Sequence, residues 1–135
     1  MLGKIINLLI VDDDKSTTSS LKALISNKYK NINVETAENG QEALLRIRKG
    51  GINAVLTDVA MPKMDGCDLY MSIMEIAPEI QVIMMSAYYD ANHAVVRAKL
   101  EGLKDVVPGP ELIEKRVLAD KIFEKIEKNF LKDKE

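Results

Sequence analysis

The sequence of 135 residues contains one cysteine, Cys67, and one histidine, His93. A single cysteine excludes an intrachain disulfide. Without a CxxC motif or a His-rich cluster, the sequence gives no sign of zinc or redox chemistry. We predict that Cys67 is a small buried core residue, and we assign His93 no role.

The sequence also lacks a large excess of either charge and a long apolar run. Its formal net charge is −2 and its pI is about 5.5, so it has no general attraction to nucleic acid or to an anionic membrane. The N-terminal apolar run is interrupted by Asn7, is too short to span a membrane and has no signal-peptide cleavage pattern. We expect a cytoplasmic protein that forms a single domain over residues 1–135 and contacts neither nucleic acid nor membrane.

The stretch Ile5–Asp14 is an apolar run that ends in three consecutive carboxylates, Asp12, Asp13 and Asp14. Such a run is typical of a strand buried on both faces, as in a parallel sheet, with the carboxylates at its C-terminal end. Like charges this close are costly to bury unless a cation or solvent compensates them. The triplet therefore indicates either a solvated turn whose last residue caps a helix, or a cation site.

Four further strands are predicted from the pattern of apolar residues. Ala54–Asp58 is apolar and again ends in a carboxylate, and Val82–Met85 is apolar and is followed by Ser86 and Ala87. Val34–Ala37 alternates apolar and polar residues, which favours a strand at the edge of a sheet. Asp105–Val107 is a short fifth strand.

Apolar residues at helical spacing, with capping or stop signals, predict five helices. The first is Lys15–Tyr29, capped by Asp14, and the second follows the Asn39–Glu42 capping box and stops at Gly50 and Gly51. The third covers Leu69–Ala77 and ends at Pro78, and the fourth follows Asp90 and contains Ala94, Val95 and Ala98. The last runs from Pro110 to near Leu131. Strands alternating with helices predict a doubly wound, five-stranded parallel sheet of order 2-1-3-4-5. In that order a crevice forms beside strand one, where Asp12, Asp13, Asp58 and Ser86 meet.

Clustered carboxylates without a His or Cys ligand suit Mg²⁺. With such a cation in place, one carboxylate can act as a nucleophile toward a phosphoryl group, and Asp58 is the candidate because it stands alone. The hydroxyl of Ser86 and the backbone N–H of Ala87 could donate hydrogen bonds to that phosphoryl group.

Three segments, in this order and at this spacing, resemble the receiver domain of two-component response regulators, whose fold is CheY-like. They are Leu9–Asp14, Leu56–Asp58 followed by Met61–Gly66, and Val82–Ala87. The resemblance covers about residues 4–120. It implies a signalling module rather than a turnover enzyme, with at most self-catalysed phosphotransfer and dephosphorylation.

The resemblance also implies roles for individual residues. Asp58 accepts a phosphoryl group from the phosphohistidine of a histidine kinase or phosphotransfer protein. Mg²⁺ is bound by Asp13, Asp58 and the backbone carbonyl of Ala60, and Asp12 acts through water. Ser86 moves toward the phosphoryl group and reports its arrival.

Two departures from the family pattern support an alternative function. Gly109, before Pro110, stands where the family has a lysine that pairs with the phosphoryl group, and Val106 stands where it has an aromatic residue. Lys15, Lys63 and Lys104 are the candidates for a substitute cation. The alternative is a degenerate receiver, an interaction module whose binding does not depend on phosphorylation.

The last helix, about residues 110–131, is longer than is usual in the family. Ala119, Phe123, Ile126 and Phe130 form an apolar stripe along it. The stripe either packs on the sheet or belongs to a dimer helix or a connector to an output domain. We expect an output domain or a second copy to bind through the fourth and fifth helices.

Two other functions fit the sequence poorly. An aspartate-nucleophile phosphatase needs a second acid two residues after Asp58, where Ala60 stands. A flavin-binding protein would use Ser16–Ser20 as its phosphate loop, but the adjacent carboxylates would repel the phosphate and no glycine allows close backbone approach.

Overall fold

The computed structural model describes residues 4–59, 61, 64–86, 103 and 105–131. The strands are β1 (Ile6–Val11), β2 (Ile32–Ala37), β3 (Ala54–Asp58), β4 (Gln81–Ser86) and β5 (Val106–Pro108). The helices are α1 (Lys15–Lys28), α2 (Gly40–Arg48), α3 (Gly66–Ile76) and α5 (Lys115–Ile126), and a π-helical turn, η1 (Glu127–Leu131), follows α5. None of the helices in this part of the chain is long and apolar enough to cross a membrane.

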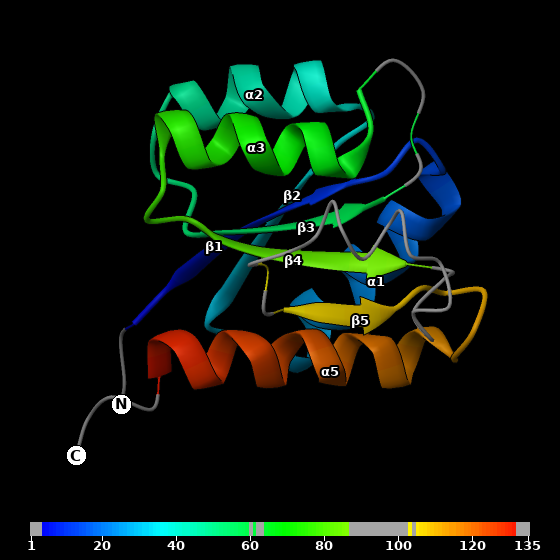
Figure 1. Cartoon of the computed structure of the whole chain (residues 1–135). Coiled ribbons are helices and arrows are strands. Elements are labelled where there is room, and N and C mark those ends of the chain that lie inside the picture. Colours follow the sequence, from blue (N-terminus) through cyan, green and yellow to red (C-terminus); the bar gives the residue numbers. More distant parts are fainter. Residues whose placement is uncertain (1–3, 60, 62–63, 87–102, 104, 132–135) are drawn as a thin grey trace.

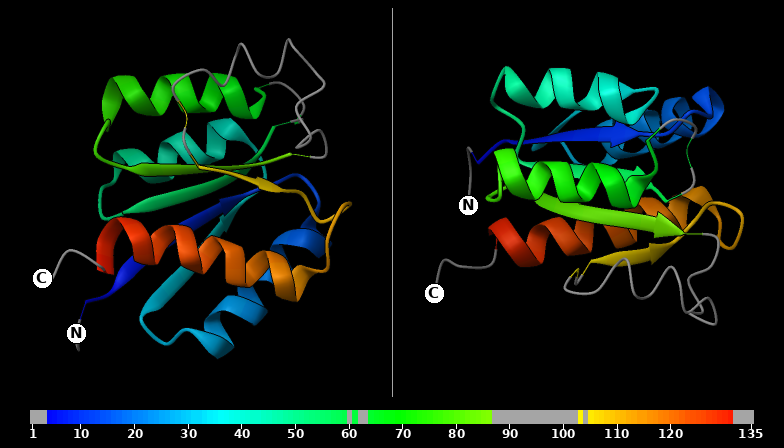
Figure 2. Two further views of the ribbon diagram at one scale, coloured as in Figure 1. Left: turned by 60° about the horizontal axis from the view of Figure 1, so that its bottom comes forward. Right: turned by 45° about the horizontal axis from the view of Figure 1, so that its top comes forward.

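The five strands form one parallel sheet in the order β2-β1-β3-β4-β5. Helices α2 and α3 cover one face of this sheet, and α1 and α5 cover the other (Figures 1 and 2). The predicted fold class and strand order are therefore confirmed. Strand β2 lies at an edge, as its alternating sequence predicts, and the more uniformly apolar β1, β3 and β4 lie inside the sheet.

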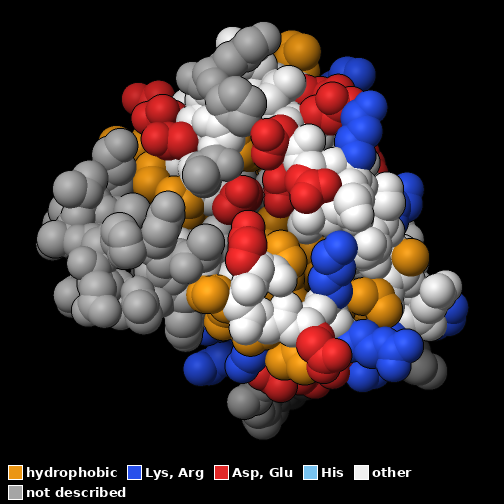
Figure 3. Space-filling model, turned by 90° about the vertical axis from the view of Figure 1, so that its right-hand side faces the viewer, with side chains coloured by type: hydrophobic (Ala, Val, Ile, Leu, Met, Phe, Trp, Pro, Cys, Tyr) orange, Lys and Arg blue, Asp and Glu red, His pale blue; other side chains and the backbone are white. Residues whose placement is uncertain are grey.

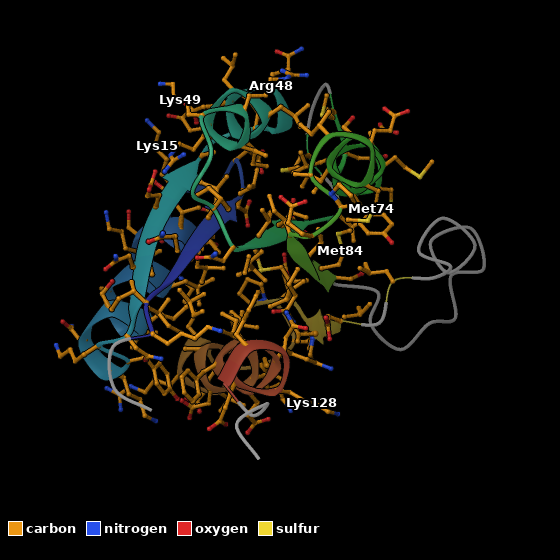
Figure 4. The ribbon with its side chains drawn as sticks, turned by 90° about the vertical axis from the view of Figure 1, so that its left-hand side faces the viewer. Lys15, Arg48, Lys49, Met74, Met84 and Lys128 are labelled. Atoms are coloured by element: carbon orange, nitrogen blue, oxygen red, sulfur yellow. The ribbon has the colours of Figure 1, made fainter. Side chains whose placement is uncertain are left out.

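The core has two main layers because successive side chains of a buried strand point to opposite faces. Leu8 and Ile10 of β1 pack in the layer beneath α1 and α5, whereas Leu9 and Val11 pack in the layer beneath α2 and α3. Cys67 is buried in a third, smaller cluster with Met84, as predicted. Figure 4 looks along the strands from their N-terminal ends and shows Met84 on the side of the sheet that α3 covers.

Short polar side chains cap three helices at the edge of the sheet where the strands end. The carboxylate of Asp14 accepts hydrogen bonds from the first turn of α1, and Asn39 accepts one from the N–H of Glu42 at 2.8 Å. The carboxylate of Glu42 in turn accepts from the N–H of Glu38 at 2.5 Å, one residue before the cap. Asp65 caps α3 in the same way. The two predicted caps in the described part of the chain, Asp14 and Asn39, are therefore confirmed.

The last helix begins later than predicted. It starts at Lys115 rather than Pro110, because the chain first forms a turn in which the N–H of Leu112 donates to the carbonyl of Gly109 at 3.0 Å. The regular helical bonds begin with the N–H of Leu118, which donates to the carbonyl of Glu114 at 2.9 Å. Ile113, which precedes this start, still packs against the core layer beneath α1 and α5. The predicted fourth helix and His93 lie outside the described residues.

The apolar stripe of the last helix packs within the chain. Ala119 and Ile126 are buried, and Phe123 and Phe130 pack against the same core layer. The ring of Phe123 stacks on that of Tyr29 with centroids 3.8 Å apart. These contacts favour the packing interpretation of the stripe over that of a dimer helix.

Candidate functional site

Polar side chains lie at the C-terminal ends of three neighbouring strands, which form one edge of the sheet. Asp12 and Asp13 follow β1, Asp58 is the last residue of β3, and Ser86 is the last residue of β4. The ends of β3 and β4 are level because Asp58 pairs with Met85, the residue before Ser86. Figure 3 looks onto this edge of the sheet, and acidic side chains gather near its centre.

The carboxylates of Asp12, Asp13 and Asp58 form one cluster, in which one oxygen of each lies within 4.8 Å of the others. Asp12 is only 5% exposed, Asp58 is half-buried and Asp13 is exposed. The structure thus brings together the three carboxylates that the sequence predicts at this edge. It also separates them by burial, which the sequence does not reveal.

Asp12 is the carboxylate whose ionisation is most strongly affected. Burial raises its pKa from the ordinary value of 3.8 to about 7, and the negative charges of Asp58 and Asp13 act in the same direction. The backbone N–H of Asp14 opposes this shift, because it donates a hydrogen bond to the carboxylate at 3.0 Å. A buried carboxylate among like charges is unfavourable in the ionised form, and a nearby cation would offset that cost.

The cluster fits a divalent cation that prefers oxygen ligands. In the described part of the chain its members are carboxylates alone, which are the hard donors that suit Mg²⁺. Asp13 and Asp58 are the more accessible pair, whereas Asp12 lies deeper. Ala60, whose backbone carbonyl is a predicted further ligand, lies outside the described residues.

Ser86 lies beside the cluster and is buried, with 1% of its surface exposed. Its backbone carbonyl accepts a hydrogen bond from the N–H of Gly109 at 3.0 Å. The end of β5 is thereby held against the end of β4, with a glycine at the position where the resemblance predicts a lysine. Ala87, the predicted N–H donor, lies outside the described residues.

The lysines considered as substitutes for the missing cation lie in different situations. Lys15 forms an ion pair with Glu38 at 3.4 Å, and both side chains are exposed. Lys63 and Lys104 lie outside the described residues. Val106, at the position of the family's aromatic residue, is half-buried against a small apolar cluster.

Two residues whose roles the sequence analysis missed pack directly against the backbone of Asp58. Thr57 is wholly buried and its hydroxyl donates to the carbonyl oxygen of Asp58 at 3.0 Å. Gly66, the first residue of α3, lies so close that an added Cβ would be 2.2 Å from the same oxygen. Thr57 could have been noticed, because it is a polar residue between the apolar part of β3 and Asp58.

The chain matches the model of the family described as "Response regulator receiver domain" over residues 8–127. It is 36% identical over 102 residues to a response regulator receiver protein of Anaeromyxobacter sp. (strain Fw109-5), covering 76% of this chain and 42% of that protein. It is 37% identical over 98 residues to the transcriptional regulatory protein ZraR of Escherichia coli (strain K12), covering 73% of this chain and 22% of that protein. The chain therefore spans less than half the length of these curated relatives.

Among solved structures, the chain is similar to the response regulator domain of Thermotoga maritima CheB. The TM-score is 0.79 at 28% sequence identity, and the match covers 92% of this chain and 95% of that domain. The similarity thus extends over most of the chain.

Proposed function

Because this chain belongs to the response regulator receiver domain family, we propose that Asp58 accepts a phosphoryl group from the phosphohistidine of a histidine kinase or phosphotransfer protein. The reaction requires Mg²⁺, and the phosphorylated form switches interactions with other proteins. The observation that carries this proposal is the cluster of Asp12, Asp13 and Asp58, with oxygens within 4.8 Å of one another where the strands end.

Asp58 is the proposed nucleophile because of its place in the cluster. Its half-buried carboxylate is accessible, whereas the buried Asp12 has a raised pKa. A carboxylate oxygen of Asp58 attacks the phosphorus atom, the bond from phosphorus to the histidine nitrogen breaks, and that nitrogen keeps the electron pair. Since Asp58 pairs with the residue before Ser86, the new phosphoryl group lies beside the end of β4.

The other residues of the site bind and orient. Asp13, Asp58 and the backbone carbonyl of Ala60 are the proposed ligands of Mg²⁺, with Asp12 acting through water. When bound, the ion neutralises charge on the phosphoryl oxygens. The hydroxyl of Ser86 and the N–H of Ala87 are the proposed hydrogen-bond donors to the phosphoryl group.

The switched state needs a recipient, as in other response regulators. We propose an output domain or a second copy of the chain that binds through the fourth and fifth helices. Packing of the apolar stripe of α5 within the chain leaves the outer face of that helix for such contacts, and Val117 on it is 43% exposed.

Intact-mass spectrometry after incubation with acetyl phosphate and Mg²⁺ tests the proposal. We expect a mass increase of one phosphoryl group in the wild type and in Asp68→Asn, and no increase in Asp58→Asn. Asp68 is the matched control because it is an exposed aspartate in the first turn of α3. Failure of the wild type to react at saturating donor would overturn the proposal.

The second candidate is a degenerate receiver, which Gly109 and Val106 favour. A fixed ammonium group beside a phosphoaspartate would add a charge-assisted hydrogen bond of roughly 1.5–3 kcal/mol, and Gly109 cannot provide one. We therefore expect Gly109→Lys to increase the rate of phosphorylation or the lifetime of the phosphorylated form. If Asp58→Asn leaves binding to a physiological partner unchanged, the degenerate receiver is the better description.

A further inference from the structure

Thr57 is a polar residue in an apolar environment. It lies in β3 directly before Asp58 and has no exposed surface. Because side chains alternate along a strand, Thr57 shares a face with Val55, which packs in the core layer beneath α2 and α3. Valine has nearly the same shape and would suit such a layer without requiring a hydrogen-bond partner.

The hydroxyl of Thr57 acts on the backbone of the next residue. Its Oγ1 donates to the carbonyl oxygen of Asp58 at 3.0 Å. The Sδ of Met61 lies 3.9 Å from the same hydroxyl, but a thioether is a weak acceptor, so the single proton is better placed on the carbonyl.

The same carbonyl oxygen is confined from the other side by α3. Gly66 approaches it so closely that an added Cβ would lie 2.2 Å away. The N–H of Gly66 also donates to the carbonyl of Val59 at 2.8 Å. The peptide group that follows Asp58 is thus held between a buried hydroxyl and the start of a helix, at the point where β3 ends.

We propose that Thr57 is a positioning residue, which orients the carboxylate of Asp58 toward Asp12 and Asp13 by fixing the peptide group that follows it. This inference rests on the proposed function and extends it. The plane of that peptide sets the backbone angles of Asp58, and through them the direction of its side chain. A supporting hydrogen bond of this kind matters because misplacement of a reacting group by about 1 Å can slow a reaction on the order of a hundredfold.

Two matched pairs of proteins isolate the effect of the hydroxyl. The first pair is the wild type and Thr57→Val, which have nearly the same shape and differ in the hydroxyl. The second pair is Thr57→Ser and Thr57→Ala, which also differ in the hydroxyl. Each variant is measured for urea unfolding, for Mg²⁺ affinity by calorimetry, and for its rate of phosphorylation by acetyl phosphate at saturating Mg²⁺.

We expect Thr57→Val to lower the phosphorylation rate by about tenfold or more and to weaken Mg²⁺ binding, beyond a modest fall in its unfolding midpoint that the lost donor to the carbonyl of Asp58 causes. Thr57→Ser should keep the rate within about twofold of the wild type, because the hydroxyl remains. A purely structural hydroxyl would change stability and leave rate and Mg²⁺ affinity together at wild-type values. If Thr57→Val does not fold, the comparison of Thr57→Ser with Thr57→Ala decides.

The outcomes separate this inference from the proposed function. A reactive wild type with an equally reactive Thr57→Val overturns the role of Thr57 alone. An unreactive wild type overturns the proposed function, and the Mg²⁺ titrations then decide about Thr57. Equal Mg²⁺ affinities in the two members of each pair, or no Mg²⁺ binding by the wild type, overturn the positioning role as well.

Discussion

The backbone N–H of Asp14 donates a 3.0 Å hydrogen bond to the carboxylate of Asp12, so the buried member of the acidic cluster is tied to the residue that caps α1. This bond stabilises the ionised form of Asp12. Burial has the larger effect, however, and raises the pKa of Asp12 to about 7. The raised pKa of Asp12 affects both the stability of the protein and its binding of metal.

The first prediction concerns stability without metal. The folded protein holds a proton on Asp12 up to about pH 7, whereas the ordinary pKa of the group is 3.8. Stability should therefore fall as the pH rises between these values. Asp12→Asn removes this loss, so we expect it to raise the free energy of unfolding by roughly 1–4 kcal/mol at about pH 8 and by little near pH 4. Urea unfolding in the presence of a chelator measures the effect.

Asp13→Asn is the control for this experiment. Asp13 is adjacent in sequence and belongs to the same cluster, but it is exposed. Its replacement should change stability much less than replacement of Asp12. An equal gain from both variants would show that repulsion within the cluster, rather than burial of Asp12, destabilises the metal-free protein.

The second prediction concerns the response to Mg²⁺. A carboxylate must lose its proton to interact with a cation, so protons compete with the metal while Asp12 titrates. The increase in melting temperature caused by a fixed Mg²⁺ concentration should therefore grow as the pH rises through about 7. The same pH series on Asp12→Asn should give a smaller and flatter increase. A response of the wild type that is constant over this range would contradict the assignment.

The strand order and the acidic cluster could be predicted because the residue pattern of each strand indicates its place in the sheet. Apolar runs that end in carboxylates define β1 and β3, and an alternating run defines the edge strand β2. Once the order is known, parallel strands must place Asp12, Asp13 and Asp58 at one edge. The helix caps follow equally well, because Asp14 and Asn39 each precede a helical pattern.

Three other features could not be predicted, because they depend on how the loops after the strands pack. The sequence cannot distinguish Asp12 from Asp13, although one is buried and the other exposed. The bond from Thr57 to the carbonyl of Asp58 joins a side chain to the backbone of the next residue, a contact that no pattern of residue types predicts. The start of α5 was predicted wrongly because a proline suits the first turn of a helix, yet the residues after Pro110 form a separate turn.

The third prediction compares two glycines that each begin a helix. An added Cβ at Gly66 would lie 2.2 Å from the backbone oxygen of Asp58, which cannot move without disturbing the end of β3. We expect Gly66→Ala to lower the free energy of unfolding by about 3 kcal/mol. At Gly40 the nearest atoms are the Sδ, Cγ and Cβ of Met64 at 2.6, 2.9 and 3.1 Å, which belong to a flexible side chain rather than to backbone. Gly40→Ala should change stability by less than about 1 kcal/mol, and urea unfolding of both variants checks the contrast.

The fourth prediction tests the packing of the last helix. Phe123 stacks on Tyr29 and packs against the core layer beneath α1 and α5. Phe123→Ala should therefore lower the free energy of unfolding by about 2 kcal/mol. Val117 lies on the same helix but is 43% exposed, so Val117→Ala should change it by less than about 0.5 kcal/mol. Similar losses from both variants would mean that the outer face of α5 is as important for folding as the stripe.

The last prediction concerns Gln81, at the opposite end of β4 from Ser86. Its Nε2 donates to the carboxylate of Asp105 at 3.0 Å and to the backbone carbonyl of Lys125 at 3.1 Å. This buried amide therefore joins β4 both to the residue before β5 and to the C-terminal end of α5. Gln81→Glu would direct a carboxylate oxygen at these two acceptors and remove the hydrogen bond that each receives from Nε2.

We expect Gln81→Glu to lower the free energy of unfolding by about 3 kcal/mol at neutral pH. The loss should diminish on acidification, because the introduced carboxyl then gains a proton and can donate one of the two bonds. Gln81→Met has a similar size and brings no charge, and it also removes Oε1, for which the described residues provide no hydrogen-bond partner. It should therefore cost only about 1 kcal/mol, with no comparable dependence on pH. If urea unfolding at neutral pH shows Gln81→Glu to be no less stable than Gln81→Met, the introduced carboxylate does not face the two acceptors, and this prediction is wrong.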